Sequence, residues 1–211
     1  MLKIIDAVHD TLLDSEIAVE ALRLDCLNLR AFARRIHKTI EEKTKKPVKV
    51  GTIVVALSRM AGAVKKTPAL RPAVKFDALS IRSPLCDTTF ENTKENLASA
   101  RSFSKPLASR GGHFFTMTQG VNEITFIISD DLKTGLFKRF NVKPKVVSEN
   151  LVGINISFSE RYLSVPNVIY GIIAKVAIRR INIVEIVSTY TELTLIIHKE
   201  DLEAALKGLN A

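Results

Sequence analysis

The chain contains an internal repeat, and this repeat limits its fold more than any other feature. With a shift of 69 residues, 114–128 (FFTMTQGVNEITFII) aligns with 183–197 (IVEIVSTYTELTLII), and after a one-residue gap DLKTGL aligns with DLEAAL. The alternation of apolar residues predicts two strands joined by a tight turn, and the segment that begins with Asp-Leu is predicted to be a helix. Glu123 and Glu192 hold equivalent positions at the start of the second strand, where both are expected to face solvent.

A further strand and helix precede each repeated unit. They are the strand 78–83 with a helix near 93–108, and the strand 151–159 with a helix over 167–180. Each resulting βαββα module is expected to place two helices on one face of a small antiparallel sheet, which is the ferredoxin-like arrangement. Residues 143–159 can close the first sheet and open the second. The second sheet has no closing segment after it, so it either lacks that strand or borrows one.

The first 64 residues follow helical periodicity. An apolar stripe from Leu29 to Ile40 predicts a helix with Asn28 as its N-cap, and a further helix is expected to start at Thr52. Two shorter helices, near 2–13 and 15–25, precede this pair.

Pro68 and Pro72 interrupt the helical pattern and predict a linker. We therefore expect an α+β protein with four parts: a helical domain at 1–66, a linker at 67–73, and two ferredoxin-like βαββα modules at 74–149 and 150–211.

Composition excludes several classes of protein. Hydrophobic residues at 46% and charged residues at 25% are typical of a folded globular chain. Cys26 and Cys86 form no CxxC pair and the four histidines are scattered, so neither a disulfide framework nor a metal site is expected. No signal peptide or membrane-spanning run occurs, which predicts a cytoplasmic protein without membrane contact. No nucleotide-binding, zinc-protease or nucleophile-elbow motif occurs, so we expect no enzyme, no catalytic residue and no cofactor.

Residues 165–206 (VPNVIYGIIAKVAIRRINIVEIVSTYTELTLIIHKEDLEAAL) resemble an ACT domain, the amino-acid-sensing module known from the regulatory parts of aspartate kinases. The resemblance is carried by the VPNVI turn, the INIVEI strand and the final strand and helix. It extends more weakly to 74–149 through the repeat. Such families show Pro-Gly in the turn, whereas this chain has Pro166-Asn167. Asn tolerates the left-handed backbone that Gly would supply, but its side chain opposes the close approach of a ligand to the backbone.

The resemblance implies a ligand site at this turn. The first amides of the helix, at Val168 and Ile169, could receive the carboxylate of an amino acid. The side-chain carbonyl of Asn182, at the head of the next strand, could accept a hydrogen bond from its ammonium group. In the alternative interpretation Asn167 only caps the helix and Asn182 only ends a turn. The expected ligand-binding residues are Pro166, Asn167, Val168, Ile169, Asn182 and Ile183.

The net charge of +9 is concentrated in the N-terminal third. Residues 1–75 hold 15 Lys and Arg against 8 Asp and Glu, a net of +7, which favours polyanionic partners. The helix pair has the outline of a helix-turn-helix, in which Arg30, Arg34, Lys38, Lys45 and Lys46 would contact phosphates while Thr52 and Arg59 would face the major groove. A helical domain for dimerisation or partner docking explains the same residues.

Three hypotheses follow for the whole chain. In the first, a homodimeric regulator binds an amino acid in its ACT-like modules and couples this to a basic helical domain that contacts duplex DNA. In the second, the chain is a non-catalytic regulatory or interaction subunit of an amino-acid biosynthetic enzyme and does not bind DNA. In the third, the ACT-like pair is a scaffold that binds no ligand.

Overall fold

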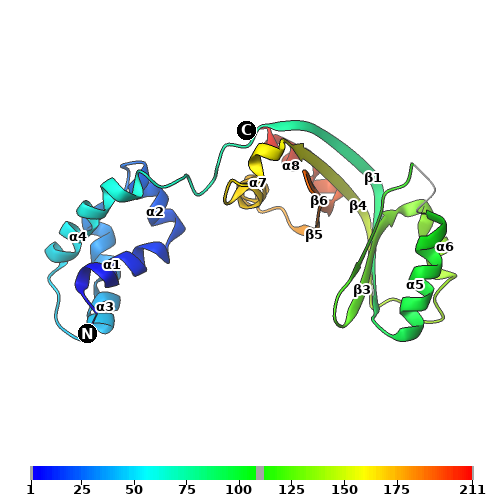
Figure 1. Cartoon of the computed structure of the whole chain (residues 1–211), viewed down its shortest axis with the longest axis horizontal. Coiled ribbons are helices and arrows are strands. Elements are labelled where there is room, and N and C mark those ends of the chain that lie inside the picture. Colours follow the sequence, from blue (N-terminus) through cyan, green and yellow to red (C-terminus); the bar gives the residue numbers. More distant parts are fainter. Residues whose placement is uncertain (1, 108–111, 211) are drawn as a thin grey trace. The chain divides into compact units, whose positions relative to one another are not determined.

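Helical periodicity over the first third of the chain produces a four-helix unit, Met1–Pro72, in the computed structural model of the protein. The structure describes residues 2–107 and 112–210. The helices of this unit are α1 (Ile4–Leu13), α2 (Glu16–Arg23), α3 (Leu29–Thr44) and α4 (Val50–Val64) (Figure 1). No helix within the described ranges is long and apolar enough to cross a membrane.

The apolar stripe of α3 lies at the centre of this unit. Ile40 of α3 is fully buried in one core with Ile53 and Leu57 of α4. The side-chain Oδ1 of Asn28 accepts a hydrogen bond from the backbone N–H of Ala31 at 3.0 Å, so Asn28 caps α3 as predicted.

The start of α4 differs from the prediction. The helix begins at Val50, and the backbone oxygen of Lys49 accepts a hydrogen bond from the N–H of Thr52 at 2.9 Å. Lys49 has an extended backbone and holds the N-cap position. Thr52 therefore lies inside the first turn of α4 and does not begin the helix.

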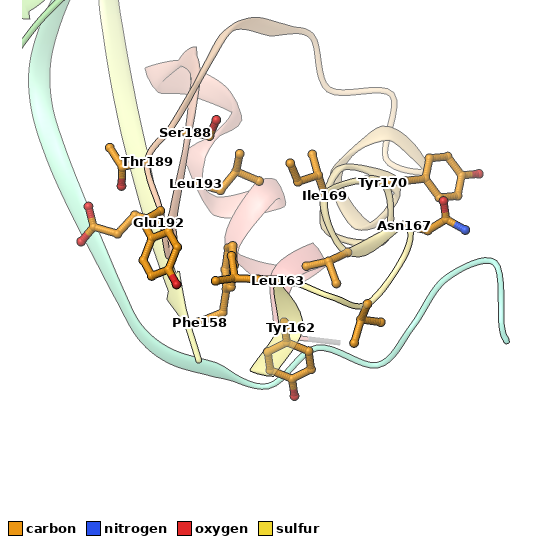
Figure 2. Close-up of a pocket in the computed structure, with 13 residues that line it drawn as sticks. Phe158, Tyr162, Leu163, Asn167, Ile169, Tyr170, Ser188, Thr189, Glu192 and Leu193 are labelled. Carbon is orange, nitrogen blue, oxygen red and sulfur yellow. The ribbon is translucent and has the colours of Figure 1, made fainter. Parts of the chain in front are cut away.

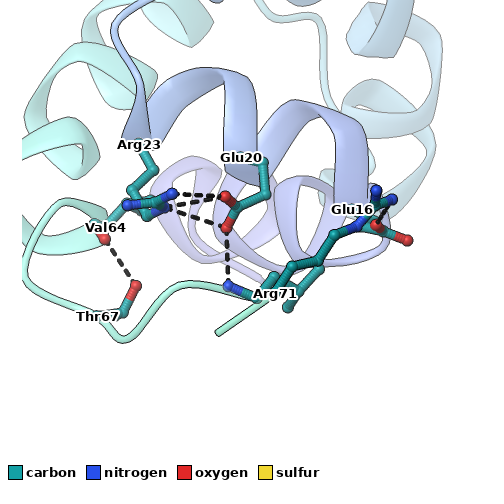
Figure 3. Close-up of polar contacts among 7 residues, drawn as sticks. Glu16, Glu20, Arg23, Val64, Thr67 and Arg71 are labelled. Carbon is teal, nitrogen blue, oxygen red and sulfur yellow. Dashed lines mark hydrogen bonds and ion pairs between the residues drawn. The ribbon is translucent and has the colours of Figure 1, made fainter. Parts of the chain in front are cut away.

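The segment after α4 returns to α2 (Figure 3). The backbone N–H of Leu70 donates to the carboxylate of Glu20 at 3.0 Å, and the guanidinium of Arg71 donates to Glu16 at 2.7 Å. The region predicted as a linker thus contains two residues that are bound to the helical unit.

The second unit, Ala73–Ala211, is α+β, as predicted. Its six-stranded antiparallel sheet has the order β2-β3-β1-β4-β6-β5. The hairpins β2–β3 and β5–β6 are the two that the repeat predicted. The strands are β1 (Phe76–Glu91), β2 (Phe115–Gln119), β3 (Glu123–Ser129), β4 (Val146–Phe158), β5 (Ile183–Ser188) and β6 (Glu192–His198). The helices are α5 (Lys94–Leu107), α6 (Lys133–Phe137), α7 (Val168–Ala177) and α8 (Leu202–Leu209).

The two modules exchange strands. Residues 85–91 of β1 pair with β3, whereas residues 76–82 of β1 pair with the end of β4. The first residues of β4 pair with residues 87–89 of β1, so β4 closes the first module and opens the second, as predicted. β1 supplies the fourth strand of the second module. The second sheet therefore borrows its closing strand, which settles the alternative that the sequence left open.

Each module has its own core beneath its helices. Phenylalanines dominate the first, where the rings of Phe90 and Phe140 stack with centroids 3.8 Å apart. Aliphatic residues of β4 and β6 form the second, with α7 and α8. Because side chains alternate along a strand, Leu85 and Leu151 lie on the opposite face, in a smaller cluster with Ile127 and Ile196.

Candidate functional site

A cavity of about 290 Å³ lies at the N-terminal end of α7. Figure 2 shows the turn and the first residues of α7 on one side, and Ser188, Thr189 and Glu192 of the β5–β6 hairpin on the other. The volume is close to the lower end of the range for small-molecule pockets. The lining residues are Phe158, Tyr162, Leu163, Val165, Asn167, Val168, Ile169, Tyr170, Ser188, Thr189, Tyr190, Glu192 and Leu193.

The turn before α7 directs the start of the helix at this cavity. Asn167 has a left-handed backbone, with φ 67° and ψ 16°, as the Pro-Asn sequence predicted. Its backbone oxygen accepts the first helical hydrogen bond, from the N–H of Gly171 at 2.8 Å. Its side chain makes no capping hydrogen bond, which argues against the interpretation of Asn167 as a side-chain cap.

The first amides of α7 are therefore available to a ligand. Within the described ranges, no hydrogen bond is formed by the backbone N–H of Val168 or Ile169. The first turn of a helix carries partial positive charge, so these two amides can receive a carboxylate.

The β5–β6 hairpin forms the opposite wall. Glu192 begins β6, and its backbone oxygen accepts a hydrogen bond from the N–H of Thr189 at 3.0 Å, which closes the hairpin turn. The sequence predicted a solvent-facing residue here, and Glu192 is exposed; it lies at the edge of the cavity, and its carboxylate points away from α7 (Figure 2). Side chains alternate along β6, so it is Leu193 that packs on the α7 side. Ser188 and Thr189 also line the cavity and carry hydroxyl groups.

All three tyrosines of the chain line the cavity. Tyr162 precedes the turn, Tyr170 lies in the first turn of α7, and Tyr190 lies at the tip of the hairpin. The sequence analysis did not single out these residues. Their confinement to a 29-residue stretch around the predicted turn was the signal that could have identified them.

The hydroxyl of Tyr162 is held in place by two donors. It accepts hydrogen bonds from the backbone N–H of Lys75 and from the guanidinium of Arg161, each at 2.9 Å. The bond from Lys75 and then the bond from Arg161 lower the pKa of this phenol, because both favour the phenolate.

No family model and no curated protein matches the sequence. The regulatory subunit of aspartate kinase from Thermus thermophilus, in a ligand-free form, matches with a TM-score of 0.52 and 18% identity, over 64% of this chain and 95% of that chain. A structure of aspartokinase alpha and beta subunits matches with a TM-score of 0.51 and 12% identity, over 65% of this chain and 97% of that chain.

A further match is to an aspartate kinase. Aspartate kinase from Clostridium acetobutylicum matches with a TM-score of 0.51 and 15% identity, over 64% of this chain but only 34% of the kinase. The second unit has the tandem ACT fold. The matched share of this chain is about the size of that ACT unit, and the N-terminal helices have no assigned counterpart.

The ACT unit brings together only part of the predicted ligand site. Asn167, Val168 and Ile169 line the cavity, and Pro166 precedes them in the turn without lining it. Asn182 and Ile183 lie beyond the other end of α7, a helix of ten residues and therefore about 15 Å long. The head of β5 is close to the start of α7 in neither sequence nor space, and the residues that line the cavity do not include Asn182 or Ile183.

The first ACT module has a cavity at the equivalent helix start, but its helix is capped. The Oγ1 of Thr93 accepts a hydrogen bond from the N–H of Asn96 at 3.1 Å. The side-chain amide of Asn96 donates to the backbone oxygen of Glu91 at 2.9 Å. The chain thus satisfies its own polar groups here, which makes α7 the better candidate for binding a ligand.

The predicted nucleic-acid contacts all lie in the helical unit, separate from the ACT site. Arg30, Arg34 and Lys38 are exposed along one side of α3, and Lys38 lies 3.9 Å from Glu42. The remaining candidates, also exposed, follow α3 or lie on α4: Lys45, Lys46, Thr52 and Arg59. Within the described ranges, no group of three or more His, Cys, Asp and Glu side chains could hold a metal ion.

Proposed function

We propose that the protein is a regulatory protein whose ACT unit binds a small zwitterionic metabolite, in the simplest case an amino acid, in the cavity at the start of α7. The observation that carries this proposal is the uncapped start of α7, whose first amides lie at a cavity between the helix and the β5–β6 hairpin. The α-carboxylate would bind the amides of Val168 and Ile169, and the hydroxyls of Ser188 and Thr189 would accept hydrogen bonds from the ammonium group. The apolar side chains of Leu163, Ile169 and Leu193 would contact the side chain of the ligand (Figure 2).

The chain would act as a non-catalytic subunit for a separate enzyme, of amino-acid biosynthesis, in the cytoplasm and as a homodimer. The fold shared with a regulatory subunit of aspartate kinase supports this role. A ligand that prefers one arrangement of the subunits would shift the population of that arrangement, with a coupling free energy of about 1 to 3 kcal/mol.

A thermal-shift screen of the full chain against the twenty amino acids tests the proposal. A ligand at 100 times its Kd adds about 2.7 kcal/mol of stability. Ile169→Asp should abolish the shift caused by the best amino acid, because it places a negative charge beside the amides that would receive the carboxylate. Asn182→Ala, at the far end of α7, should preserve the shift. The absence of a shift with any amino acid, or an unchanged shift in Ile169→Asp, would count against the site.

Duplex DNA is the second candidate partner, and the exposed row of Arg30, Arg34 and Lys38 on α3 favours it. Binding through phosphates should weaken with salt, at a slope near −0.9 per phosphate neutralised. Anisotropy titrations of labelled genomic fragments at low salt decide this point: the Arg30→Glu and Arg34→Glu double variant should lose binding, and no saturable binding by the unmodified chain would remove DNA from consideration.

A further inference from the structure

A second cavity, in the helical unit, has a different chemical character from the ACT site. It is a groove of about 330 Å³ between α2 and α3. Its floor is apolar, with Ile17 and Ala18 from α2, Leu27 from the turn between the helices, and Phe32 from α3. A groove of this kind between two helices can receive the apolar face of a third helix.

An exposed aliphatic side chain lies at the edge of the groove. Ile17 of α2 lines the groove and is 82% exposed. Leu24, which follows α2 and does not line the groove, is also 61% exposed. A large aliphatic side chain exposed beside an apolar groove is typical of an interaction site.

Acidic groups around the groove are already engaged within the unit. The Oε1 of Glu16 lies 2.7 Å from a guanidinium nitrogen of Arg71, and the Oε2 of Glu20 lies 2.9 Å from a guanidinium nitrogen of Arg23 (Figure 3). In Met1–Pro72, seven of the eight acidic side chains lie within 4.0 Å of a Lys, Arg or His nitrogen: Asp10, Asp14, Glu16, Glu20, Asp25, Glu41 and Glu42.

The basic group on the α3 side of the groove is not engaged in the same way. Arg35 lines the groove, whereas Arg30 and Arg34 lie on another side of α3. In the described ranges, Arg35 forms no ion pair. The groove therefore has an unpaired cation beside its apolar floor, in a unit of net positive charge, and a complementary surface would be apolar and acidic.

We propose that this groove docks an acidic amphipathic helix of a separate protein, with apolar side chains against Ile17 and Phe32 and carboxylates facing Arg35. Duplex DNA complements the arginines but not the apolar floor. A second copy of the helical unit offers Asp6 as its one carboxylate outside the ion pairs described, so it complements the rim poorly. The proposal concerns the helical unit and does not depend on metabolite binding by the ACT unit.

A synthetic peptide can serve as the probe for this groove. It would be a labelled helical peptide of about 16 residues, with leucines at helical spacing and glutamates beside them. Fluorescence anisotropy with the full chain should show saturable binding. Two matched peptides, one with Lys in place of Glu and one with Ser in place of Leu, should each bind at least about tenfold more weakly.

Variants of the chain locate the binding. Ile17→Asp and Arg35→Glu should each weaken binding by about tenfold or more. Val121→Asp is the matched control, because Val121 is 91% exposed in the turn between β2 and β3. This variant should bind like the unmodified chain. Circular dichroism and the Tm check that each variant is folded. Because the side chain of Ile17 is mostly exposed, we expect Ile17→Asp to keep the fold.

Three results would overturn the proposal. The first is that the Leu/Glu peptide shows no saturable binding. The second is that folded Ile17→Asp binds the peptide as well as the unmodified chain does. The third is that the peptide with Ser in place of Leu binds equally well, because binding would then depend on charge alone. Sedimentation velocity tests whether a second copy of the chain occupies the groove. Self-association that Ile17→Asp abolishes would assign the groove to a second copy of the chain and reject a separate partner.

Discussion

The hydroxyl of Tyr162 accepts a hydrogen bond from the backbone N–H of Lys75 at 2.9 Å. Tyr162 lines the cavity at the start of α7, and Lys75 lies three residues beyond Pro72, where the helical unit ends. A side chain in the wall of the cavity thus holds the first residues of the ACT unit, just before β1. If a ligand moves the ring of Tyr162, the hydrogen bond that holds the segment before β1 at Lys75 is broken or strengthened.

Tyr162→Phe tests this relationship. The variant keeps the ring in the wall of the cavity but removes the acceptor for the Lys75 amide. Hydrogen exchange at Lys75 should therefore accelerate, because an exposed amide without a partner exchanges faster. Tyr190→Phe, at the exposed hairpin tip, is the control and should leave exchange at Lys75 unchanged. Equal protection of Lys75 in Tyr162→Phe would show that the hydroxyl does not hold this segment.

A second prediction concerns Asp87, a carboxyl buried in β1. It is 7% exposed, and its Oδ1 has no hydrogen-bond partner in the part of the chain that the structure describes. Burial, and then the nearby charge of Glu185, raise the pKa of Asp87 to about 6. The folded state therefore holds this proton more tightly than the unfolded state, whose pKa is about 3.9. Stability from this group is present below pH 4 and is lost as the pH rises through 6.

Asp87→Asn should remove this pH dependence. A shift of about two pKa units corresponds to roughly 3 kcal/mol, so the variant should be more stable than the unmodified chain at pH 8 by up to that amount. Urea unfolding at pH 4.5 and pH 8 measures the difference. Glu185→Gln should reduce the dependence but not abolish it, since burial is the larger cause. Identical pH profiles for Asp87→Asn and the unmodified chain would contradict the assignment.

A third prediction compares two helical glycines. A Cβ at Gly208 in α8 would lie 2.6 Å from the backbone oxygen of Lys175 in α7, so Gly208→Ala forces the two helices apart. We expect a loss of about 1 to 3 kcal/mol in the free energy of unfolding. Apart from its own helix turn, Gly62 in α4 has no atom of the described residues within 4 Å of an added Cβ, and Gly62→Ala should stabilise the chain by about 0.5 to 1 kcal/mol. Urea unfolding measures both, and two changes of the same sign would refute the packing argument.

Local patterns predicted most of the elements but not their long-range pairing. The hairpins around Glu123 and Glu192 followed from alternation over seven residues, and the burial of Ile40 followed from helical spacing. The exchange of strands between modules did not, because the pairing of Leu79 with Ile156 joins residues far apart in the chain. Pro84, which lies where the β1–β4 register shifts, marks the place where β1 passes from one module to the other.

The candidate site shows the same limit. The turn geometry at Asn167 was predictable, because a left-handed position after Pro favours Gly or Asn. The partner wall was not, since Asn182 comes soon after α7 in the sequence, whereas Ser188 and Thr189 reach the cavity at the start of α7 through the β5–β6 hairpin. A correct prediction of this wall required the direction of β5 relative to α7, which the residues near the turn do not specify.

The last prediction concerns Glu20, which joins α2 to the segment after α4 (Figure 3). Its carboxylate accepts hydrogen bonds from the guanidinium of Arg23 and from the N–H of Leu70. The bond from Arg23 is the largest of the causes that lower the pKa of Glu20, and the bond from Leu70 adds to it. A lowered pKa means that this contact stabilises the fold at neutral pH and is lost as the pH falls through the acid range.

Glu20→Ala should free the segment after α4 without unfolding the helices, because the core of the helical unit does not include this side chain. Trypsin needs an extended, mobile chain, so cleavage after Lys65 and Lys66 should become several-fold faster at pH 8. Glu42→Ala removes an exposed ion pair on α3 instead and should leave the cleavage rate unchanged. Time courses followed by mass spectrometry identify the cut sites. Equal rates in both variants would show that Glu20 does not hold this segment, and that the hydrophobic contacts of Val64 in the core are sufficient to protect it.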